Sequence, residues 1–358
     1  MRAALFTGVH DQLLIEDVTL GAPGPFDVLV RIGASGVCHS DLSVVDGGRP
    51  LVAPAILGHE AAGTVEAIGV RVSRVQVGDR VIASFIPSCG ECFWCRHEQS
   101  NLCSKSADFP DFARVTRTDG STATAYLGLG TFAEQMVVHE SSVVSVRTEL
   151  PDDQLALLGC GVTTGVCAVL NSAKVEAGAS VAVVGCGGVG QAVIQGAVIA
   201  GAVRIIAVDP VALKRNTALV LGATDVVDPA VVDPLDAVAA LTSGLGVDYA
   251  FEATGHPHVT RQAFMMTRRG GAVIMLGMPR FDAELRLPAL PLFAEGKRVF
   301  GSKYGDAQVR RAFQMLIDLT EAGRLNLEAL VSRRIALHEV NDALRAIQDG
   351  EVIRSVIV

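Results

Sequence analysis

Four of the eight cysteines lie close together in the first third of the chain. They are spaced C-x2-C-x2-C-x7-C, and they are Cys89, Cys92, Cys95 and Cys103. Four thiolates in one short segment suit the tetrahedral shell of a structural zinc ion, which leaves no open position for chemistry. Iron–sulfur clusters also use four cysteines, but their common spacings differ in the last interval, and free thiols are the remaining alternative. The spacing therefore favours a structural zinc that stabilises this lobe.

Three further residues suggest a second metal site, although they lie far apart in the sequence. Cys38 stands in GVCHSD, His59 in GHE and Cys160 in LGCGVTTG. Two thiolates and one imidazole would leave the fourth zinc position open for water or a substrate, as in a catalytic site. Taken singly, each residue has an ordinary explanation, with Cys160 as a buried apolar thiol and His59 as a core histidine.

A glycine-rich turn in the middle of the chain predicts a dinucleotide site. The sequence GCGGVG follows the strand sequence SVAVV and opens a helix, and its candidate binding residues are Gly185, Gly187, Gly188, Val189 and Gly190. The glycines would allow a tight turn, let the backbone approach a pyrophosphate and let the helix pack closely on the sheet. The N-terminus of the helix would then face the phosphates with free N–H groups. A packing turn without a ligand is the alternative.

An acidic residue after the next strand bears on the choice of cofactor. Asp209 lies 19 residues after Gly190. A carboxylate at this position accepts hydrogen bonds from the 2′-hydroxyl of the adenosine ribose and repels a 2′-phosphate. The pattern therefore favours NAD over NADP.

The elements that must position these residues fall into two kinds. The first third of the chain is rich in valine, and strand-like stretches separated by glycine or proline indicate an irregular β domain. From about residue 162 strands and helices alternate, which predicts an α/β fold with a doubly wound parallel sheet. The predicted strands are 180–185, 204–210, 224–228, 247–255, 271–277 and 297–302, and the predicted helices are 191–201, 211–222, 258–270 and 307–323. We therefore expect a catalytic domain at 1–161, a dinucleotide-binding domain at 162–303 and a return segment at 304–358 that completes the first domain.

Composition restricts the class of protein. Half of the 358 residues are apolar and 19% are charged, which predicts a large core and a buried subunit interface. The net charge of −8 argues against a nucleic-acid partner. Residues 177–203 carry no charge, but their seven glycines favour a strand, a turn and a helix over a membrane span. We expect a cytoplasmic protein, where thiols stay reduced and bind metals more often than they form disulfides.

Taken together, these motifs resemble the zinc-containing medium-chain alcohol dehydrogenases over essentially the whole chain. GVCHSD, LGHEAAGTVEAIG, the four-cysteine lobe, GCGVTTG, GCGGVG and the terminal IRSVIV follow the family's order and spacing. Two cysteines and one histidine are also the catalytic ligand set of alcohol dehydrogenase. The resemblance implies a GroES-like β-rich catalytic domain into which a Rossmann domain is inserted. Phrases such as SFIPSCGEC and AGRLNLEALVSR are similar to the actinobacterial nicotinoprotein branch, and class III enzymes are also similar.

The resemblance also implies roles for individual residues. Cys38, His59 and Cys160 would hold the catalytic zinc, and the family's residues near this metal match Ser40, Asp41 and Glu60. A surface or helix-capping role is the alternative for the two acids. Besides the glycine turn, the implied cofactor-binding residues are His39, Thr164, Asp209, Lys214, Gly277 and Arg354. Phe85 would line the substrate pocket, with an ordinary core phenylalanine as the alternative.

The implied reaction is the reversible oxidation of primary alcohols, medium-chain or aromatic, to aldehydes by hydride transfer from a zinc alkoxide to NAD. The alternatives are a nicotinoprotein with tightly bound NAD(H) and a thiol-adduct formaldehyde dehydrogenase. The second is weakened because Cys103 is followed by SKSAD, without the arginine of that branch. Ser43 stands where well-known members carry a histidine for proton relay. A non-catalytic NAD-binding protein is disfavoured because all three zinc ligands are present. We further expect two zinc ions per chain and a homodimer, with a tetramer as the alternative.

Overall fold

The computed structural model describes residues 1–109 and 115–358, which form two compact units. Unit 1 comprises Met1–Cys160, Gln308–Asp318 and Val331–Val358, and unit 2 comprises Gly161–Ala307 and Leu319–Leu330. The sequence-based boundaries assign all of 304–358 to the first domain, whereas this division groups residues 304–307 and Leu319–Leu330 with unit 2.

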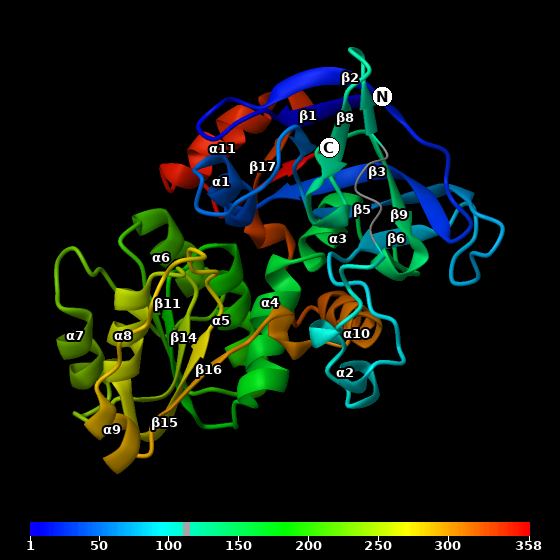
Figure 1. The fold of residues 1–358 in the computed structure, drawn as a ribbon. Coiled ribbons are helices and arrows are strands. Elements are labelled where there is room, and N and C mark those ends of the chain that lie inside the picture. Colours follow the sequence, from blue (N-terminus) through cyan, green and yellow to red (C-terminus); the bar gives the residue numbers. More distant parts are fainter. Residues whose placement is uncertain (110–114) are drawn as a thin grey trace. The chain divides into compact units, whose positions relative to one another are not determined.

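Unit 1 is built from two β structures (Figure 1). The first is a closed barrel in the order β1 (Arg2–Phe6), β2 (Leu14–Leu20), β7 (Val115–Arg117), β8 (Thr122–Ala125) and β4 (Ala55–Ile56). The second is a seven-stranded sheet in the order β10 (Val143–Ser145), β6 (Arg80–Ala83), β5 (Glu60–Ile68), β3 (Asp27–Val37), β18 (Arg354–Ile357) and β17 (Val331–Ile335), with β9 (Gln135–His139) also paired to β3. The last strand of the chain thus lies beside β3, with Ser355 opposite Val37.

Short helices connect or cover these strands. They are α1 (His39–Val45), α2 (Phe93–Arg96), α3 (Asp152–Leu158) and α11 (Val340–Gln348). The residues of α10 (Val309–Glu321) belong to unit 1 up to Asp318 and to unit 2 after it. The 3-10 turns of unit 1 are η1 (Ser100–Leu102), η2 (Tyr126–Gly128), η3 (Glu140–Ser142) and η7 (Leu337–Glu339).

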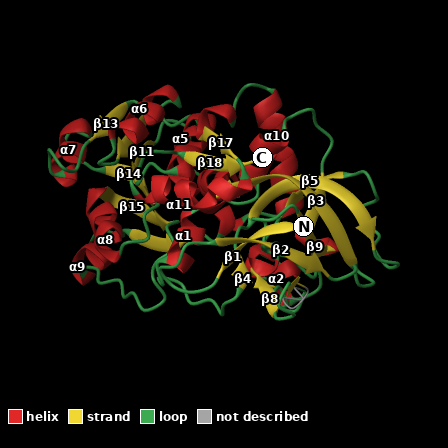
Figure 2. Ribbon diagram, turned by 90° about the horizontal axis from the view of Figure 1, so that it is seen from above, coloured by secondary structure: helices red, strands yellow, loops and turns green. Residues whose placement is uncertain are grey.

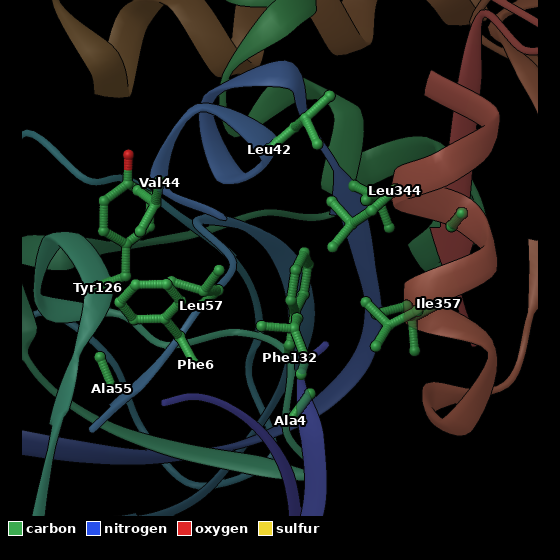
Figure 3. Packing of buried hydrophobic residues seen from close by; sticks show 14 of the residues in the cluster. Ala4, Phe6, Leu42, Val44, Ala55, Leu57, Tyr126, Phe132, Leu344 and Ile357 are labelled. Carbon is green, nitrogen blue, oxygen red and sulfur yellow. The ribbon is translucent and has the colours of Figure 1, made fainter. Parts of the chain in front are cut away.

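One core of unit 1 is formed by residues from both ends of the chain (Figure 3). Helix α11 buries Val340, Ala343 and Leu344, which recur at the spacing of one helical face. They pack with Phe6 and Phe132 in one apolar cluster. The C-terminal segment is therefore part of the folded catalytic unit.

Unit 2 contains a six-stranded sheet in which every pair of neighbours is parallel. The order is β13 (Asp225–Val227), β12 (Arg204–Val208), β11 (Ser180–Val184), β14 (Val247–Glu252), β15 (Thr267–Met275) and β16 (Arg298–Gly301). From β11 the chain first adds strands on one side of the sheet and then on the other side. This is the strand order of a Rossmann sheet, and it confirms the predicted doubly wound fold.

The helices of unit 2 surround this sheet (Figure 2). They are α4 (Gly161–Cys167), α5 (Gly188–Ala200), α6 (Ala212–Val220), α7 (Pro234–Leu241), α8 (Pro257–Met266) and α9 (Ala289–Ala294), with the π-helix η4 (Ala168–Ala173) and the 3-10 turns η5 (Tyr304–Asp306) and η6 (Glu328–Leu330). Residues 177–203 form the predicted strand, turn and helix. Among the described residues no single helix is long and apolar enough to cross a membrane. The segments Asp152–Leu158 and Gly161–Ala173, which are bent relative to each other, reach that length and apolar content only when taken together.

One predicted helix is too long. The helix predicted at 258–270 ends at Met266, and β15 begins at Thr267. The Thr267 hydroxyl donates to the carbonyl of Phe264 at 2.8 Å, which satisfies a terminal helix carbonyl. Thr267 also pairs with Val247 of β14, so strand pairing replaces the helix from this residue on.

Candidate functional site

The four-cysteine lobe brings its thiols together as a zinc site requires. The sulfur atoms of Cys89, Cys92, Cys95 and Cys103 all lie within 4.8 Å of one another. Three of the sulfur–sulfur distances are 3.6, 3.9 and 4.0 Å. Zinc–sulfur bonds of about 2.3 Å in a tetrahedron place the sulfurs about 3.8 Å apart. The donor set therefore fits structural zinc, and the N–H of Cys95 is the main cause that lowers the pKa of Cys92 to about 5, toward the thiolate that binds metal.

The second predicted group also converges, in unit 1. Ligand atoms of Cys38, His59, Glu60 and Cys160 lie within 4.8 Å of one another, and all four residues are buried. Cys38 follows β3, the pair His59–Glu60 enters β5, and Cys160 follows α3. Because β3 and β5 are antiparallel with Gly36 opposite Glu60, the end of one strand meets the start of the other. A hydrogen bond with Cys160 is the main cause that lowers the pKa of the Cys38 thiol.

Asp41 connects three parts of this group. Its Oδ1 accepts hydrogen bonds from Nδ1 of His59 and from the N–H of Gly58, both at 3.1 Å. Its Oδ2 accepts from the N–H of Cys38, also at 3.1 Å. Donation by Nδ1 leaves Nε2 of His59 as the atom with a free lone pair for a metal. This fully buried carboxylate therefore orients the histidine and the backbone beside both ligands.

Glu60 and Arg354 form a buried ion pair beside the group. Nη2 of Arg354 lies 3.0 Å from Oε1 of Glu60, although within the described part of the chain neither carboxylate oxygen has a partner in hydrogen-bond geometry. Arg354 also donates to the carbonyl of Val37 at 3.2 Å. Burial raises the pKa of Glu60 to about 8, against the opposing charge of Arg354. Among the residues described, this buried carboxylate has no hydrogen bond, and it lies within reach of three ligand atoms. A metal cation bound nearby would stabilise its negative charge.

Helix α1 carries two serine hydroxyls, those of Ser40 and Ser43. Ser40 lies beside the ligand, with its Oγ 3.8 Å from the Cys38 sulfur. Ser43 lies on the same helix and donates to the carbonyl of His39 at 3.0 Å. The side chain of His39 is exposed.

Two aromatic rings pack edge-on against His59. The ring of Phe85 lies 5.5 Å from the imidazole, and the ring of Tyr126 lies 5.7 Å from it. Phe85 is the residue that the resemblance assigns to the substrate pocket. Tyr126 was not predicted, and no local signal in its sequence indicates this contact. Its hydroxyl donates to the carbonyl of Ser40 at 3.4 Å, and the guanidinium of Arg49 lies 5.4 Å from its ring centre.

In unit 2, the glycine turn has the geometry of a phosphate-binding loop. Gly185 has φ +90°, a conformation that favours glycine. A Cβ on Gly190 would collide with the Gly185 carbonyl, so the start of α5 packs against the turn only without a side chain. A Cβ on Gly187 would meet no atom within 4 Å, which leaves room beside the turn for a ligand. The residues therefore fit the pyrophosphate of a dinucleotide at the N-terminus of α5.

Asp209 lies at the end of β12, next to this turn. Its two carboxylate oxygens accept from the N–H groups of Cys186 and Val211, each at 2.8 Å. The other predicted cofactor residues of this unit are Thr164 on α4, Lys214 on α6 and Gly277, where a Cβ would collide with the backbone of Gly255. His39 and Arg354, by contrast, belong to unit 1.

Comparison with known proteins matches both units. Residues 24–152 match the family model described as an alcohol dehydrogenase GroES-like domain, and residues 188–322 match that of a zinc-binding dehydrogenase. The chain is 38% identical to a probable S-(hydroxymethyl)glutathione dehydrogenase of Schizosaccharomyces pombe over 99% of this chain and 96% of the relative. It is 37% identical to an NDMA-dependent alcohol dehydrogenase of Amycolatopsis methanolica over 100% and 98%.

A solved structure agrees with these sequence matches. The benzyl alcohol dehydrogenase of Acinetobacter calcoaceticus has a TM-score of 0.92 and 30% identity, over 99% of this chain and 98% of that one. The family's cofactors are zinc and NAD(P), for which the two units provide fitting residues. The chain belongs to the zinc-dependent alcohol dehydrogenase family of oxidoreductases.

Proposed function

We propose that this enzyme oxidises primary alcohols to aldehydes, and reduces those aldehydes, with zinc held by Cys38, His59 and Cys160. The observation that carries the proposal is the buried group of ligand atoms within 4.8 Å, in which a fully buried Asp41 orients the histidine. When bound there, zinc would polarise the substrate oxygen as a Lewis acid, and NAD would carry the hydride.

Other side chains of the enzyme would transfer the substrate proton and line the site. The Ser40 hydroxyl lies beside the ligand group, 3.8 Å from the Cys38 sulfur, and we assign to it the transfer of the alcohol proton. Phe85 and Tyr126 present aromatic rings around His59, which suits an aromatic or medium-chain substrate more than a very small alcohol. The benzyl alcohol dehydrogenase with the same fold agrees with this choice.

A substrate screen tests the proposal. The purified enzyme should oxidise benzyl and medium-chain primary alcohols with NAD, with higher kcat/KM than for secondary alcohols or methanol. A strong preference for secondary alcohols would contradict the substrate class. We also propose NAD over NADP, because the Asp209 carboxylate lies beside the glycine turn.

A second candidate is a nicotinoprotein that keeps its NAD(H) bound through turnover. The similarity to the NDMA-dependent enzyme supports it. Gel-filtered protein should then absorb in the reduced nicotinamide band and turn over with an artificial acceptor without added NAD. A clean apo spectrum with turnover on added NAD would return the enzyme to the exchanging class.

The third candidate is oxidation of a formaldehyde–thiol adduct, which the relative from Schizosaccharomyces pombe carries in its name. The residues directly after Cys103, SKSAD, include no arginine, which speaks against it in this chain. Turnover of formaldehyde that depends on glutathione, and exceeds turnover of benzyl alcohol, would overturn our choice.

We propose a homodimer, with a tetramer as the alternative. Strand β16 is an edge of the described sheet of unit 2, and α9 immediately precedes it. Leu290, Phe293 and Phe281 nearby in the chain are 72%, 88% and 73% exposed. An edge strand flanked by such apolar surface favours cover by a second copy. Light scattering should give twice the chain mass, and Phe293→Glu should weaken the dimer.

We place the enzyme in the cytoplasm. All eight cysteines are free thiols, and six of them belong to the two metal-binding groups. Such ligands must stay reduced to bind zinc. Cell fractionation tests this assignment.

A further inference from the structure

Gln191 is a buried side chain on α5, between the glycine turn and α6, to which the proposed function assigns no role. We propose that Gln191 is a positioning residue that fixes the adenosine half of the cofactor site. The inference rests on the proposed assignment of the glycine turn to NAD.

A single amide nitrogen of Gln191 joins two segments. Its Nε2 donates to the carbonyl of Cys186 at 2.9 Å and to the carbonyl of Lys214 at 2.8 Å. Cys186 lies within the glycine turn, and Lys214 lies in the first turn of α6. The backbone N–H of Gln191 also donates to the carbonyl of Gly187 at 2.8 Å. The residue therefore holds the turn and the start of α6 at a set separation.

The same turn is held from its other side by Asp209. The N–H of Cys186 donates to Asp209 and its carbonyl accepts from Gln191, so both backbone polar groups of Cys186 are used. Asp209 is assigned to the adenosine ribose, and Lys214 is among the implied cofactor-binding residues. Gln191 thus fixes the distance between the pyrophosphate turn and the ribose-binding segment before any ligand arrives, which lowers the ordering cost of binding.

The amide oxygen of Gln191 carries a cost that the contacts of its amide nitrogen must offset. Gln191 is 0% exposed, and its Oε1 has no hydrogen-bond partner among residues 1–109 and 115–358. Burial of an unpartnered amide oxygen costs stability, which an apolar side chain of similar size would avoid. The glutamine is therefore explained by the two carbonyls that its N–H groups hold.

Gln195, one turn further along α5, provides a matched control. It is also buried, but its Nε2 donates to the carbonyl of Asn326 at 3.2 Å, and its Oε1 accepts from the N–H of Asn326 at 2.7 Å. Gln195 thus ties the same helix to a segment away from the glycine turn. Loss of this residue should affect stability without affecting the cofactor.

The experiment compares Gln191→Leu with Gln195→Leu. Calorimetry gives the Kd of ADP-ribose and NADH, and thermal unfolding without ligand gives the Tm. For Gln191→Leu we expect both Kd values to rise about tenfold or more, with kcat at saturating NAD little changed. For Gln195→Leu we expect both Kd values to stay within about twofold of the wild type. Its Tm should fall at least as much as that of Gln191→Leu. Gln191→Met replaces Gln191→Leu if the latter does not fold.

The outcomes separate this inference from the proposed function. If both variants weaken ADP-ribose equally, or if Gln191→Leu binds it as the wild type does, Gln191 is not a positioning residue. If the wild type itself binds neither ADP-ribose nor NADH, the assigned cofactor site fails, and this inference fails with it.

Discussion

Asp41 accepts a hydrogen bond from Nδ1 of His59 at 3.1 Å while both side chains are buried. Because the same carboxylate also accepts from the N–H groups of Gly58 and Cys38, one side chain fixes two of the proposed zinc ligands. The relationship makes the metal affinity of this site depend on a residue that does not bind the metal.

Asp41→Asn should therefore weaken zinc at the catalytic site by about 10–100-fold, the usual effect of removing a group that orients a ligand. Zinc in the four-cysteine lobe should be unaffected. Asp46→Asn, at the exposed end of the same helix, is the control. Zinc retention is measured by competition with a chelator, and equal retention in both variants would contradict the role of Asp41.

Two zinc ions should bind per chain, with separable effects. Cys160→Ser should abolish turnover and release one zinc, while the fold and the other zinc remain. Cys95→Ser should release the second zinc and lower stability, because structural zinc contributes directly to folding. Metal analysis with thermal unfolding checks both variants. A single zinc in the wild type would contradict the two-site interpretation.

Asp209→Asn should raise the use of NADP relative to NAD, because it removes a charge that repels a 2′-phosphate. Asp209→Ala should also weaken NAD binding, since it leaves the N–H groups of Cys186 and Val211 without their carboxylate partner. The ratio of kcat/KM for the two cofactors is the measurement. A wild-type preference for NADP would overturn the assignment.

Ser43→His should raise the rate of alcohol oxidation at neutral pH by roughly tenfold or more. The Ser43 hydroxyl donates to the carbonyl of His39, and serine has no group that titrates near neutral pH to receive the substrate proton. The wild type should respond to imidazole buffer at fixed pH and ionic strength, and the variant should respond less.

The prediction is also tested in a single turnover, because slow release of the cofactor would hide the proton-transfer step in kcat. A wild-type rate that is independent of buffer in a single turnover would show that another residue completes the relay.

Some elements of the fold have local signals in the sequence, and others do not. Helix α7 was not predicted, although Asp233 and Pro234 form a typical N-terminus, and the Asp233 carboxylate accepts from the N–H groups of Leu235 and Asp236. The end of α8 was misplaced because Thr267 is drawn into β15 by pairing with Val247, a contact that lies outside any local pattern.

The sequence by itself determined the features that depend on short-range spacing. The cysteine spacing from Cys89 to Cys103 predicts a compact four-thiolate site, and the glycines of GCGGVG between strand and helix predict a dinucleotide loop. Alternation of strands and helices predicted the parallel sheet, which the structure confirms.

Only the tertiary structure decided which distant residues meet. Cys38, His59 and Cys160 converge because β3 pairs with β5 and α3 packs beside them, and Arg354 reaches Glu60 because β18 lies on β3. Tyr126 against His59 and Gln191 between two carbonyls are contacts of the same kind. Strand register and helix packing set the partners of these residues. Both depend on the burial of side chains throughout the chain, and no local pattern of residues encodes them.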